Sequence, residues 1–493
     1  MGDDRIMHVT SKPASSRSSR GLGPSLRHWI GGGGADLPEI FAVGGSVRDH
    51  LLERSIGDVD ITCPSAEKAA GNIAASRPFR TTTIILEKKP HAPCFRVVNK
   101  NNPSDFIDVV EMHGNTIEED LCRRDFTINA MAAAVTKQGD IGDIMDPLAG
   151  RDDLAKGCIR CCRPDAFAAD PLRMLRAVRI AADLNFTIPG ETFALMKNHA
   201  DKITASAFER ITGELFMLLA RPHSFAFIQM LDQTGLLDAL FPEIHPMKGC
   251  RQNAYHHLDV WDHSMATLAN CETIINDPHR CFPDVGDAIR ATLNPEGIIP
   301  VLKLAALFHD AGKPGAIGFD EKKQRTVFYG HADIGQSMAA EIADRLRLST
   351  DRRQLFTNMV KHHMWPHELA KPKVKKPTVV RWFRKVGDLT IPILILAAAD
   401  SMAKQGGKAS FAEKDRLMDW INTAAAEYFL ALKPRFRRPA LLTGRDLMNA
   451  GMAPGPAMGN LLRKIRMMQD EGVIGTREAA LEKALELMKG KNR

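Results

Sequence analysis

Long hydrophobic runs are missing from this sequence. The longest covers residues 391–399, far short of the roughly 20 residues that a helix needs to cross a bilayer. The first residues, from Met1 to Asp4, include two acids, and no apolar segment typical of a secretory signal follows them. We therefore expect a cytoplasmic protein that has no membrane partner.

The cysteine pattern of a disulfide-bonded protein is absent as well. The 493 residues include nine cysteines, an odd number scattered along a long chain, which favours reduced thiols over a disulfide framework. Cys158, Cys161 and Cys162 form the one suggestive cluster. Because no second Cys-x-x-Cys pair accompanies it, ordinary thiols are favoured over a zinc site.

Excess charge is lacking over most of the chain. Residues 431–493 carry 13 Lys and Arg against 6 Asp and Glu, a net charge of +7 that equals the formal net charge of the whole chain. A basic C-terminal segment on a balanced body favours binding to RNA, because phosphate neutralisation gives affinity that is independent of sequence. The alternative is a solvated helical face that has no partner.

A glycine turn is the first motif that the sequence does contain, and its residues are Gly44, Gly45, Ser46, Arg48 and Asp49. Glycine has no Cβ, so backbone N–H groups can close on a triphosphate. Ser46 offers a hydroxyl donor, and Arg48 offers a fork that matches phosphate oxygens. The turn therefore predicts a nucleotide-binding site.

Three aspartates in strand-like segments are the candidate catalytic residues. Residues i and i+2 of a strand share a face, so Asp58 and Asp60 can hold Mg²⁺ against the phosphates of a nucleotide. Asp108 lies in another apolar run, residues 106–110, and could complete a site for two metals about 4 Å apart. A glycine turn followed at this spacing by paired acids predicts nucleotidyl transfer.

Two further strings are candidates for reading the sugar and the base. Arg123 and Arg124 could neutralise a triphosphate, while Asp125 and Asn129 could hydrogen-bond a ribose hydroxyl; a helix start with a solvated basic face is the alternative. The second string has Asp170 and Arg173 one helical turn apart, with Arg176 one turn further on. A surface ion pair is the alternative interpretation of that spacing.

The chemistry of the bases sharpens the interpretation of the Asp–Arg pair. Cytosine and adenine present an amino donor beside a ring-nitrogen acceptor, whereas uracil and guanine present a carbonyl beside a ring N–H. The Asp170 acceptor and the Arg173 donor therefore suit C and A. Against U and G they would be left unpaired, which rejects a base strongly.

Together these motifs closely resemble the class II tRNA nucleotidyltransferase and bacterial poly(A) polymerase family. The ordered match runs through residues 44–49, 58–60, 123–131, 146–150 and 170–179. The resemblance implies a polymerase-β-like palm, Mg²⁺ at Asp58 and Asp60, and a choice between CTP and ATP made by Asp170 and Arg173. The family pattern usually has Glu before that Asp, and this chain has Ala169 there instead. This departure bears on how the pair of Asp170 and Arg173 is supported.

The mechanism that we expect follows the logic of two metals. The 3′-hydroxyl of a tRNA or another RNA attacks the α-phosphate in line, and no covalent intermediate is needed. Lys88, Lys89 and Pro90 fall where the family has a flexible loop used in adding the final A. Addition of CCA to tRNA is the first hypothesis and a poly(A) polymerase with the same head is the second.

A second set of candidate ligands, on helical segments further along the chain, resembles the HD superfamily of metal phosphohydrolases. Imidazole and carboxylate ligands suit a divalent transition metal better than Mg²⁺, and a metal-bound water would attack a phosphate ester. A metal phosphohydrolase whose head only binds RNA, and a non-catalytic RNA-binding scaffold, are the competing hypotheses. The candidate ligands are His263, His309, Asp310, His331, His362 and Asp400, with His363 as the alternative to His362.

The fold class predicted from these patterns is an α+β head followed by an all-α body. Within the body, residues 371–385 hold seven basic residues and no acid around Trp382 and Phe383, which either stack on single-stranded RNA or lie buried beneath a basic helix. The predicted domains are a disordered tail over 1–36, the head over 37–160, a helical neck over 161–250 that binds the base and RNA, the HD-type domain over 251–405, and a basic helical RNA-binding extension over 406–493.

Overall fold

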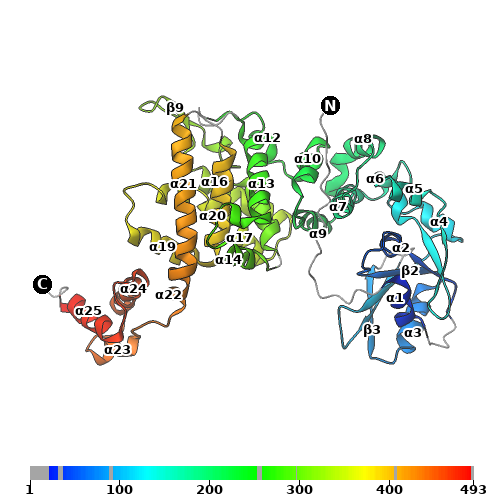
Figure 1. Cartoon of the computed structure of the whole chain (residues 1–493), viewed down its shortest axis with the longest axis horizontal. Coiled ribbons are helices and arrows are strands. Elements are labelled where there is room, and N and C mark those ends of the chain that lie inside the picture. The colour runs from blue at the N-terminus through cyan, green and yellow to red at the C-terminus, as the bar shows by residue number, and fades with distance from the viewer. Residues whose placement is uncertain are drawn as a thin grey trace. The chain divides into compact units, whose positions relative to one another are not determined.

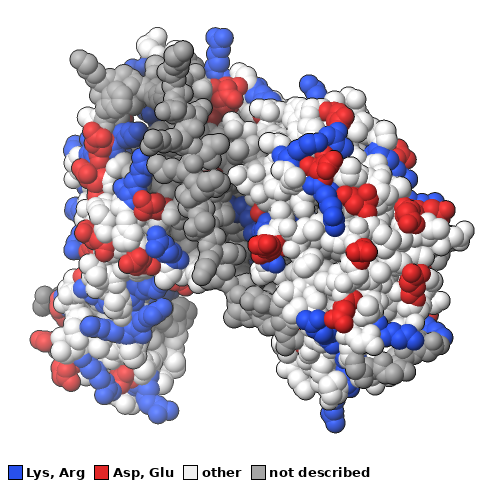
Figure 2. All heavy atoms as spheres, turned by 45° about the vertical axis from the view of Figure 1, so that its right-hand side comes forward, with Lys and Arg blue, Asp and Glu red and all other residues white. Residues whose placement is uncertain are grey.

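The computed structural model describes residues 21–31, 37–87, 93–252, 258–295, 297–404 and 408–489. It divides into two compact units, Met1–Lys202 and Ile203–Arg493 (Figure 1). On the face drawn in Figure 2, Lys and Arg are interspersed with Asp and Glu, in keeping with the balanced charge of most of the chain.

The first unit is built on a mixed sheet of seven strands in the order β3-β4-β5-β2-β1-β6-β7. β2 and β5 pair in parallel and every other pair is antiparallel. The strands are β1 (Ile40–Val43), β2 (Val59–Cys63), β3 (Thr81–Glu87), β4 (Cys94–Asn99), β5 (Phe106–Glu111), β6 (Ala132–Val135) and β7 (Ile141–Met145). This mixed sheet confirms the predicted α+β head.

The helices of this unit include one that the sequence reasoning missed. Residues 22–29 fall in the predicted disordered tail, yet they form α1 (Leu22–Trp29), with Leu22, Leu26 and Trp29 buried. That prediction is wrong here because a short apolar face is hidden among Gly, Ser and Arg; residues 1–20 and 32–36 lie outside the described residues. The remaining helices are α2 (Gly45–Leu51), α3 (Ala66–Ala75), α4 (Ile117–Cys122), η1 (Thr127–Asn129), α5 (Gly150–Ala155), α6 (Ala166–Ala169), α7 (Arg173–Leu184) and α8 (Gly190–His199).

Where the structure describes it, the second unit is helical apart from one hairpin, as the sequence predicts. Its central helices α13 (Val260–Asn276), α15 (Ile298–Phe308) and α20 (Thr390–Ala403) pack against one another, and α16 (His331–Arg345) packs on α17 (Thr350–His362). The hairpin pairs β8 (Gly318–Asp320) with β9 (Arg325–Val327). The other elements up to α22 are η2 (Ala200–Ala205), which begins in the first unit, α9 (Phe208–Leu219), α10 (Phe225–Gln233), α11 (Leu236–Leu240), α12 (Ile244–Met247), η3 (Pro278–Arg280), α14 (Gly286–Leu293), η4 (Pro314–Ala316), α18 (Trp365–Leu369), α19 (Lys376–Val386), η5 (Gly387–Leu389), α21 (Lys408–Glu427), η6 (Tyr428–Leu432) and α22 (Lys433–Arg437).

The stretch Lys376–Ala403 is long and apolar enough to cross a membrane by length and composition alone, but 78% of its apolar window is buried inside the protein. Trp382 and Phe383, on α19, are buried as well, with exposed fractions of 3% and 0%. Of the two alternatives for these aromatic residues, the structure therefore shows burial beneath a basic helix.

The chain ends in a small helical group. It consists of α23 (Gly444–Asn449), α24 (Pro456–Glu471) and α25 (Arg477–Lys489) around one apolar cluster. This arrangement matches the helical C-terminal extension expected from the sequence. Of the basic residues there, Arg463 and Lys464 are exposed on α24.

Candidate functional sites

Two of the three candidate catalytic aspartates lie opposite each other at the centre of the head sheet. β2 and β5 run in parallel, and Asp60 is in register with Asp108. Gly44, with φ of +70°, turns toward them: a Cβ at this position would lie 3.6 Å from Oδ2 of Asp60 and 3.5 Å from Nη1 of Arg124. The predicted phosphate turn, two acids and one arginine thus meet at one place, and the exposed Asp58 lies two residues before Asp60.

The neighbouring acids of this site affect the pKa of Asp60. Burial, followed by repulsion from Asp108 and from Asp58, raises the pKa of Asp60 to about 6, although Arg124 and Arg176 act in the opposite direction. Carboxylate oxygens that repel one another are the donors that Mg²⁺ prefers. The donor set therefore fits a hard cation.

Asp108 has a counter-ion that the sequence reasoning missed. Nε and Nη2 of Arg96 donate to the two carboxylate oxygens of Asp108 at 2.8 and 2.7 Å, and the guanidinium lies 3.7 Å from the ring centre of Phe106. Arg96 is the cross-strand partner of Asp108 on β4. The strand pairing needed to find it was not predictable from a local motif.

The residues of the phosphate turn are joined to the predicted sugar-reading string. Arg48 pairs with Asp49 and donates from Nη1 to Oδ1 of Asn129 at 2.8 Å. The buried Ser46 hydroxyl donates to the Val43 carbonyl at 2.8 Å in this structure. Contact between these groups and a triphosphate stays a prediction.

The sugar-reading string is itself cross-linked to α7. Nε of Arg176 lies 2.8 Å from Oδ2 of Asp125, and Nδ2 of Asn129 donates to Oδ1 of Asp125 at 3.2 Å. Burial works against the charge of Asp125, but Arg176 and the hydrogen bonds to the carboxylate hold its pKa below the usual value. Nε and Nη2 of Arg124 donate to Oδ2 of Asp120 at 3.1 and 2.8 Å. This contact positions Arg124, and the sequence reasoning missed it as well.

Arg173 is held by the main chain of the same string. Its Nη1 and Nη2 atoms donate to the carbonyl oxygens of Arg124 and Arg123 at 3.2 and 3.1 Å. Asp170 caps the turn that precedes α7, accepting from the N–H of Leu172 at 3.2 Å. Ala169, which precedes Asp170, is exposed. The carbonyl oxygens of Arg123 and Arg124 hold the Arg173 side chain in place. Lys88, Lys89 and Pro90, the expected loop, lie outside the described residues.

Four side chains meet at the centre of the helical body. His263 comes from α13, His309 and Asp310 directly follow α15, and Asp400 comes from α20. All four are buried, and one potential ligand atom of each lies within 4.8 Å of the others. Nε2 of His263 lies 2.9 Å from Oδ1 of Asp400, and Nε2 of His309 lies 3.1 Å from Oδ2 of Asp310.

A second group shares Asp310 with the first and contains His331 and His363. Nε2 of His331 and Nε2 of His363 lie 3.5 and 3.6 Å from Oδ1 of Asp310. The structure corrects the choice of His362 as a candidate ligand. His362 lines a separate cavity, which Lys385 also lines. Neighbouring residues of a helix point about 100° apart, so only one of the two histidines can face Asp310.

The imidazoles are oriented for metal binding. Nδ1 of His309, His331 and His363 lies 2.9, 2.8 and 2.6 Å from the carbonyl oxygens of Ala306, Phe328 and Val360. A ring that donates its Nδ1–H in this way presents the lone pair of Nε2. The buried Nε2 of His309 lies 3.1 Å from Oδ2 of Asp310 and 3.8 Å from Oδ1 of Asp400, and such a set of imidazole and carboxylate groups fits a divalent transition metal.

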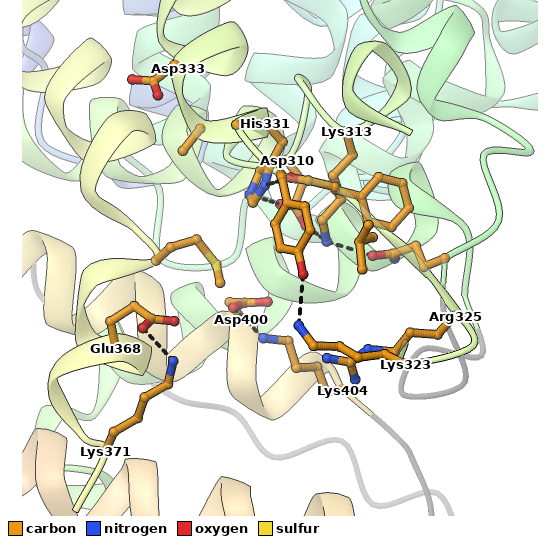
Figure 3. Close-up of a pocket in the computed structure, with 17 residues that line it drawn as sticks. Asp310, Lys313, Lys323, Arg325, His331, Asp333, Glu368, Lys371, Asp400 and Lys404 are labelled. Carbon is orange, nitrogen blue, oxygen red and sulfur yellow. Dashed lines mark hydrogen bonds and ion pairs between the residues drawn. The ribbon is translucent and has the colours of Figure 1, made fainter. Parts of the chain in front are cut away.

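Three residues that the sequence reasoning missed surround the carboxylates of Asp310 and Asp400. Figure 3 shows two of them, Lys313 and Lys404, pointing toward the cavity beside these aspartates. Lys313 pairs with Asp310 at 2.5 Å, Lys404 pairs with Asp400 at 2.7 Å, and Nε2 of His367 lies 3.0 Å from Asp400. Burial opposes the carboxylate charges, yet these lysines and the imidazoles hold the pKa of both aspartates well below the usual range.

The cysteines take part in neither site. All nine are free thiols, which confirms the prediction that no disulfide framework holds the chain. Burial raises the pKa of Cys161 to about 12. Among the described residues, neither candidate metal-binding group includes Cys158, Cys161 or Cys162.

Comparison with known proteins places these two sites in a family. The "Poly A polymerase head domain" matches residues 40–160, the "Probable RNA and SrmB- binding site of polymerase A" matches 185–248, and the "HD domain" matches 260–404. The A-adding tRNA nucleotidyltransferase of Deinococcus radiodurans is 30% identical over 90% of this chain and 94% of the relative. The chain belongs to the tRNA nucleotidyltransferase and poly(A) polymerase family. It is an enzyme with nucleotidyltransferase activity.

Other members of the family differ in what their names say they add. The CC-adding tRNA nucleotidyltransferase of Thermus thermophilus is 30% identical and covers 90% of this chain and 92% of the relative. The Multifunctional CCA protein of Nitrosococcus oceani is 28% identical, over 87% of this chain and 97% of the relative. The Thermotoga maritima CCA-adding enzyme, solved with tRNA, has a TM-score of 0.61 and 22% identity over 91% of each chain, which shows a shared fold.

Proposed function

We propose that the head adds CMP and AMP to the 3′ end of tRNA, building or repairing the CCA terminus. The observation that carries the proposal is the placement of Asp60 opposite Asp108 on adjacent parallel strands, directly behind the Gly44 turn. The names of the relatives, which include A-adding, CC-adding and multifunctional CCA proteins, support tRNA as the substrate. The proposal includes a cytoplasmic location.

The catalytic acids would act through Mg²⁺. Asp58, Asp60 and Asp108 would hold it, and when bound it supplies the positive charge that lowers the cost of bringing a triphosphate to these acids. The chain itself positions the other reactant. Arg48 and Arg124 lie where they can neutralise the phosphates, and each is already oriented by a carboxylate neighbour.

The remaining head residues select the nucleotide. Asp125 and Asn129 are hydrogen-bonded to each other and hold the polar groups suited to a ribose hydroxyl. Arg173 is fixed by two carbonyls of the same string, so the base-reading and sugar-reading residues form one connected network. We expect Asp170 and Arg173 to accept C and A and to reject U and G.

The substrate end and the nucleotide set can be tested in one experiment. The purified protein is incubated with Mg²⁺ and tRNAs that end at the discriminator base, at C or at CC, with CTP and ATP offered separately and together. Extension that stops at CCA supports the proposal, whereas CC alone or A alone assigns a partial reaction. A long A ladder would replace it with a poly(A) polymerase.

We also propose that the neck and the basic C-terminal extension hold the RNA. Arg463 and Lys464 are exposed on α24, and phosphate contacts by such residues strengthen binding without sequence preference. Arg463→Glu with Lys464→Glu should raise KM for tRNA by roughly 10-fold and weaken its salt dependence while kcat stays close to the wild-type value. An unchanged KM would remove these residues from the RNA site.

A second activity, hydrolysis of a phosphate ester in the body, is proposed from the two His–Asp groups. The buried Nε2 of His309, which faces carboxylate oxygens of Asp310 and Asp400, and the shared Asp310 support it. His263, His309, Asp310 and Asp400 would hold one divalent transition metal, and Asp310, His331 and His363 would hold another; such ions supply a nucleophilic water. Release of nitrophenol from p-nitrophenyl phosphate in the presence of Mn²⁺, Co²⁺ or Ni²⁺, lost in Asp310→Ala, tests it.

A further inference from the structure

The β8–β9 hairpin forms one wall of the cavity beside the His–Asp groups. Gly318 pairs with Val327 and Asp320 with Arg325. Side chains alternate across a strand, so Arg325 and Val327 share a face of β9, and Tyr329 lies in the turn that follows this strand. All three line a cavity of 590 Å³ that is also lined by Asp310, His331 and Asp400.

Tyr329 is an exposed aromatic side chain on this wall. Its exposed fraction is 68%, and no core contact explains a large ring at this position. The ring is nevertheless oriented: its hydroxyl donates to Asp320 at 3.0 Å and accepts from Lys323 at 2.8 Å. Phe319, with an exposed fraction of 61%, lies on the opposite face of the hairpin and does not line the cavity.

Five Lys and Arg residues line the cavity against four Asp and Glu residues, and three of the basic residues lie on one side of it. Figure 3 shows Lys323, Arg325 and Lys404 gathered on one side of it, with Asp400 between them and Lys371, and with Asp310 and His331 beyond. An anion can therefore approach the His–Asp groups through a basic side of the cavity. Its volume is within the range of roughly 300–1,000 Å³ that small-molecule sites have.

We propose that this hairpin recognises the phosphorylated end of a single-stranded RNA. The terminal base stacks on Tyr329, Lys323 and Arg325 bind backbone phosphate, and the terminal phosphate group reaches the His–Asp groups. Stacking on an aromatic side chain is tolerant of base identity because every base has a π face. The inference rests on the proposed phosphohydrolase function and adds the substrate class of that site.

The test uses binding in the absence of turnover. The probe is an RNA trinucleotide with a 3′-phosphate and 2-aminopurine as its last base, titrated with the metal-free full-length protein. We expect quenching of 2-aminopurine by the wild type and a Kd raised roughly 5- to 100-fold in Tyr329→Ala. Tyr329→Phe keeps the ring and should bind within about threefold of the wild type.

Matched controls separate this contact from general effects. Phe319→Ala removes an equally exposed ring from the other face, and Lys322→Ala removes a cation of the same hairpin that does not line the cavity. Both should bind the probe as the wild type does, while Lys323→Ala with Arg325→Ala should weaken it. A 5′-fluorescein trinucleotide with an abasic last residue, followed by anisotropy, should bind the wild type and Tyr329→Ala with the same Kd. Equal binding by Tyr329→Ala and Phe319→Ala would overturn the proposal.

Hydrolysis, measured separately, shows which of the two ideas has failed. If p-nitrophenyl phosphate is not hydrolysed but quenching depends on Tyr329, the body site binds RNA ends without cleaving them and the phosphohydrolase proposal fails alone. If hydrolysis is normal and quenching is independent of Tyr329, the hairpin inference fails alone. If Tyr329→Ala is correctly folded and quenches the probe as the wild type does, the hairpin inference is therefore wrong.

Discussion

The two sites handle carboxylate charge in opposite ways. In the head, burial and the neighbouring acids raise the pKa of Asp60 to about 6, whereas in the body the pKa values of Asp310 and Asp400 lie well below the usual range because lysines and imidazoles surround them. The head acids repel one another although Arg96, Arg124 and Arg176 lie close to them, whereas lysines and imidazoles pair with the buried carboxylates of the body. The contrast teaches that the two sites compensate carboxylate charge differently, and from it we expect that they also differ in the metals they take.

Removal of transition metals by a chelator should separate the activities of the two sites most strongly. Phenanthroline binds transition metals in preference to Mg²⁺, so we expect it to reduce hydrolysis of p-nitrophenyl phosphate by at least roughly 100-fold. Nucleotide addition in excess Mg²⁺ should remain within about twofold. Parallel loss of both activities would show that the sites do not differ in their metals.

The two neighbouring histidines of α17 provide the next test. His363 faces Asp310 and His362 lies in a separate cavity. His363→Ala should lower hydrolysis by roughly 100-fold because it removes a ligand, and the matched His362→Ala should lower it by less than about threefold. The reverse order would restore His362 as the ligand.

In the first unit, Arg173→Ala should relax base selection. Removal of the donor eliminates the unpaired charge that rejects uracil, so discrimination against UTP, measured as the ratio of kcat/KM values, should fall roughly 10- to 100-fold. Lys197→Ala is the control, since it removes an exposed cation from α8 of the same unit. Unchanged discrimination would remove Arg173 from the base-reading role.

The smallest expected effect concerns stability. The folded pKa of Asp60, about 6, lies above the ordinary value of 3.8, so its unfavourable contribution is absent below about pH 4 and grows as pH rises to about 6. Without Mg²⁺ at pH 7.5, Asp60→Asn should therefore raise the free energy of unfolding, by at most about 3 kcal/mol. Denaturant unfolding that shows no gain, or the same gain at pH 4, would contradict this.

Much of the head was predictable because its signals are local. The turn at Gly44 and the alternation around Asp60 each depend on neighbouring residues. Arg96 and Asp120 were missed because they reach Asp108 and Arg124 through strand pairing and a helical turn that no motif marks.

In the body, the order of His and Asp residues predicted most of the side chains that meet in the two His–Asp groups, but not which of His362 and His363 faces Asp310. That choice depends on the rotation of α17, which packing against α15 and α16 determines. Lys313, His367 and Lys404 were equally hidden, since their role comes from buried carboxylates that only the tertiary structure brings near. Helix α1 was missed because its apolar face is short.

The most direct test of two independent sites is a crossed pair of substitutions in the full-length protein. Asp60→Ala and His309→Ala are each assayed for tRNA extension with CTP and ATP and for hydrolysis of p-nitrophenyl phosphate. We predict that Asp60→Ala abolishes extension and leaves hydrolysis intact, and that His309→Ala does the reverse. If either substitution removes both activities while the protein stays folded, the two sites are one and the account is wrong.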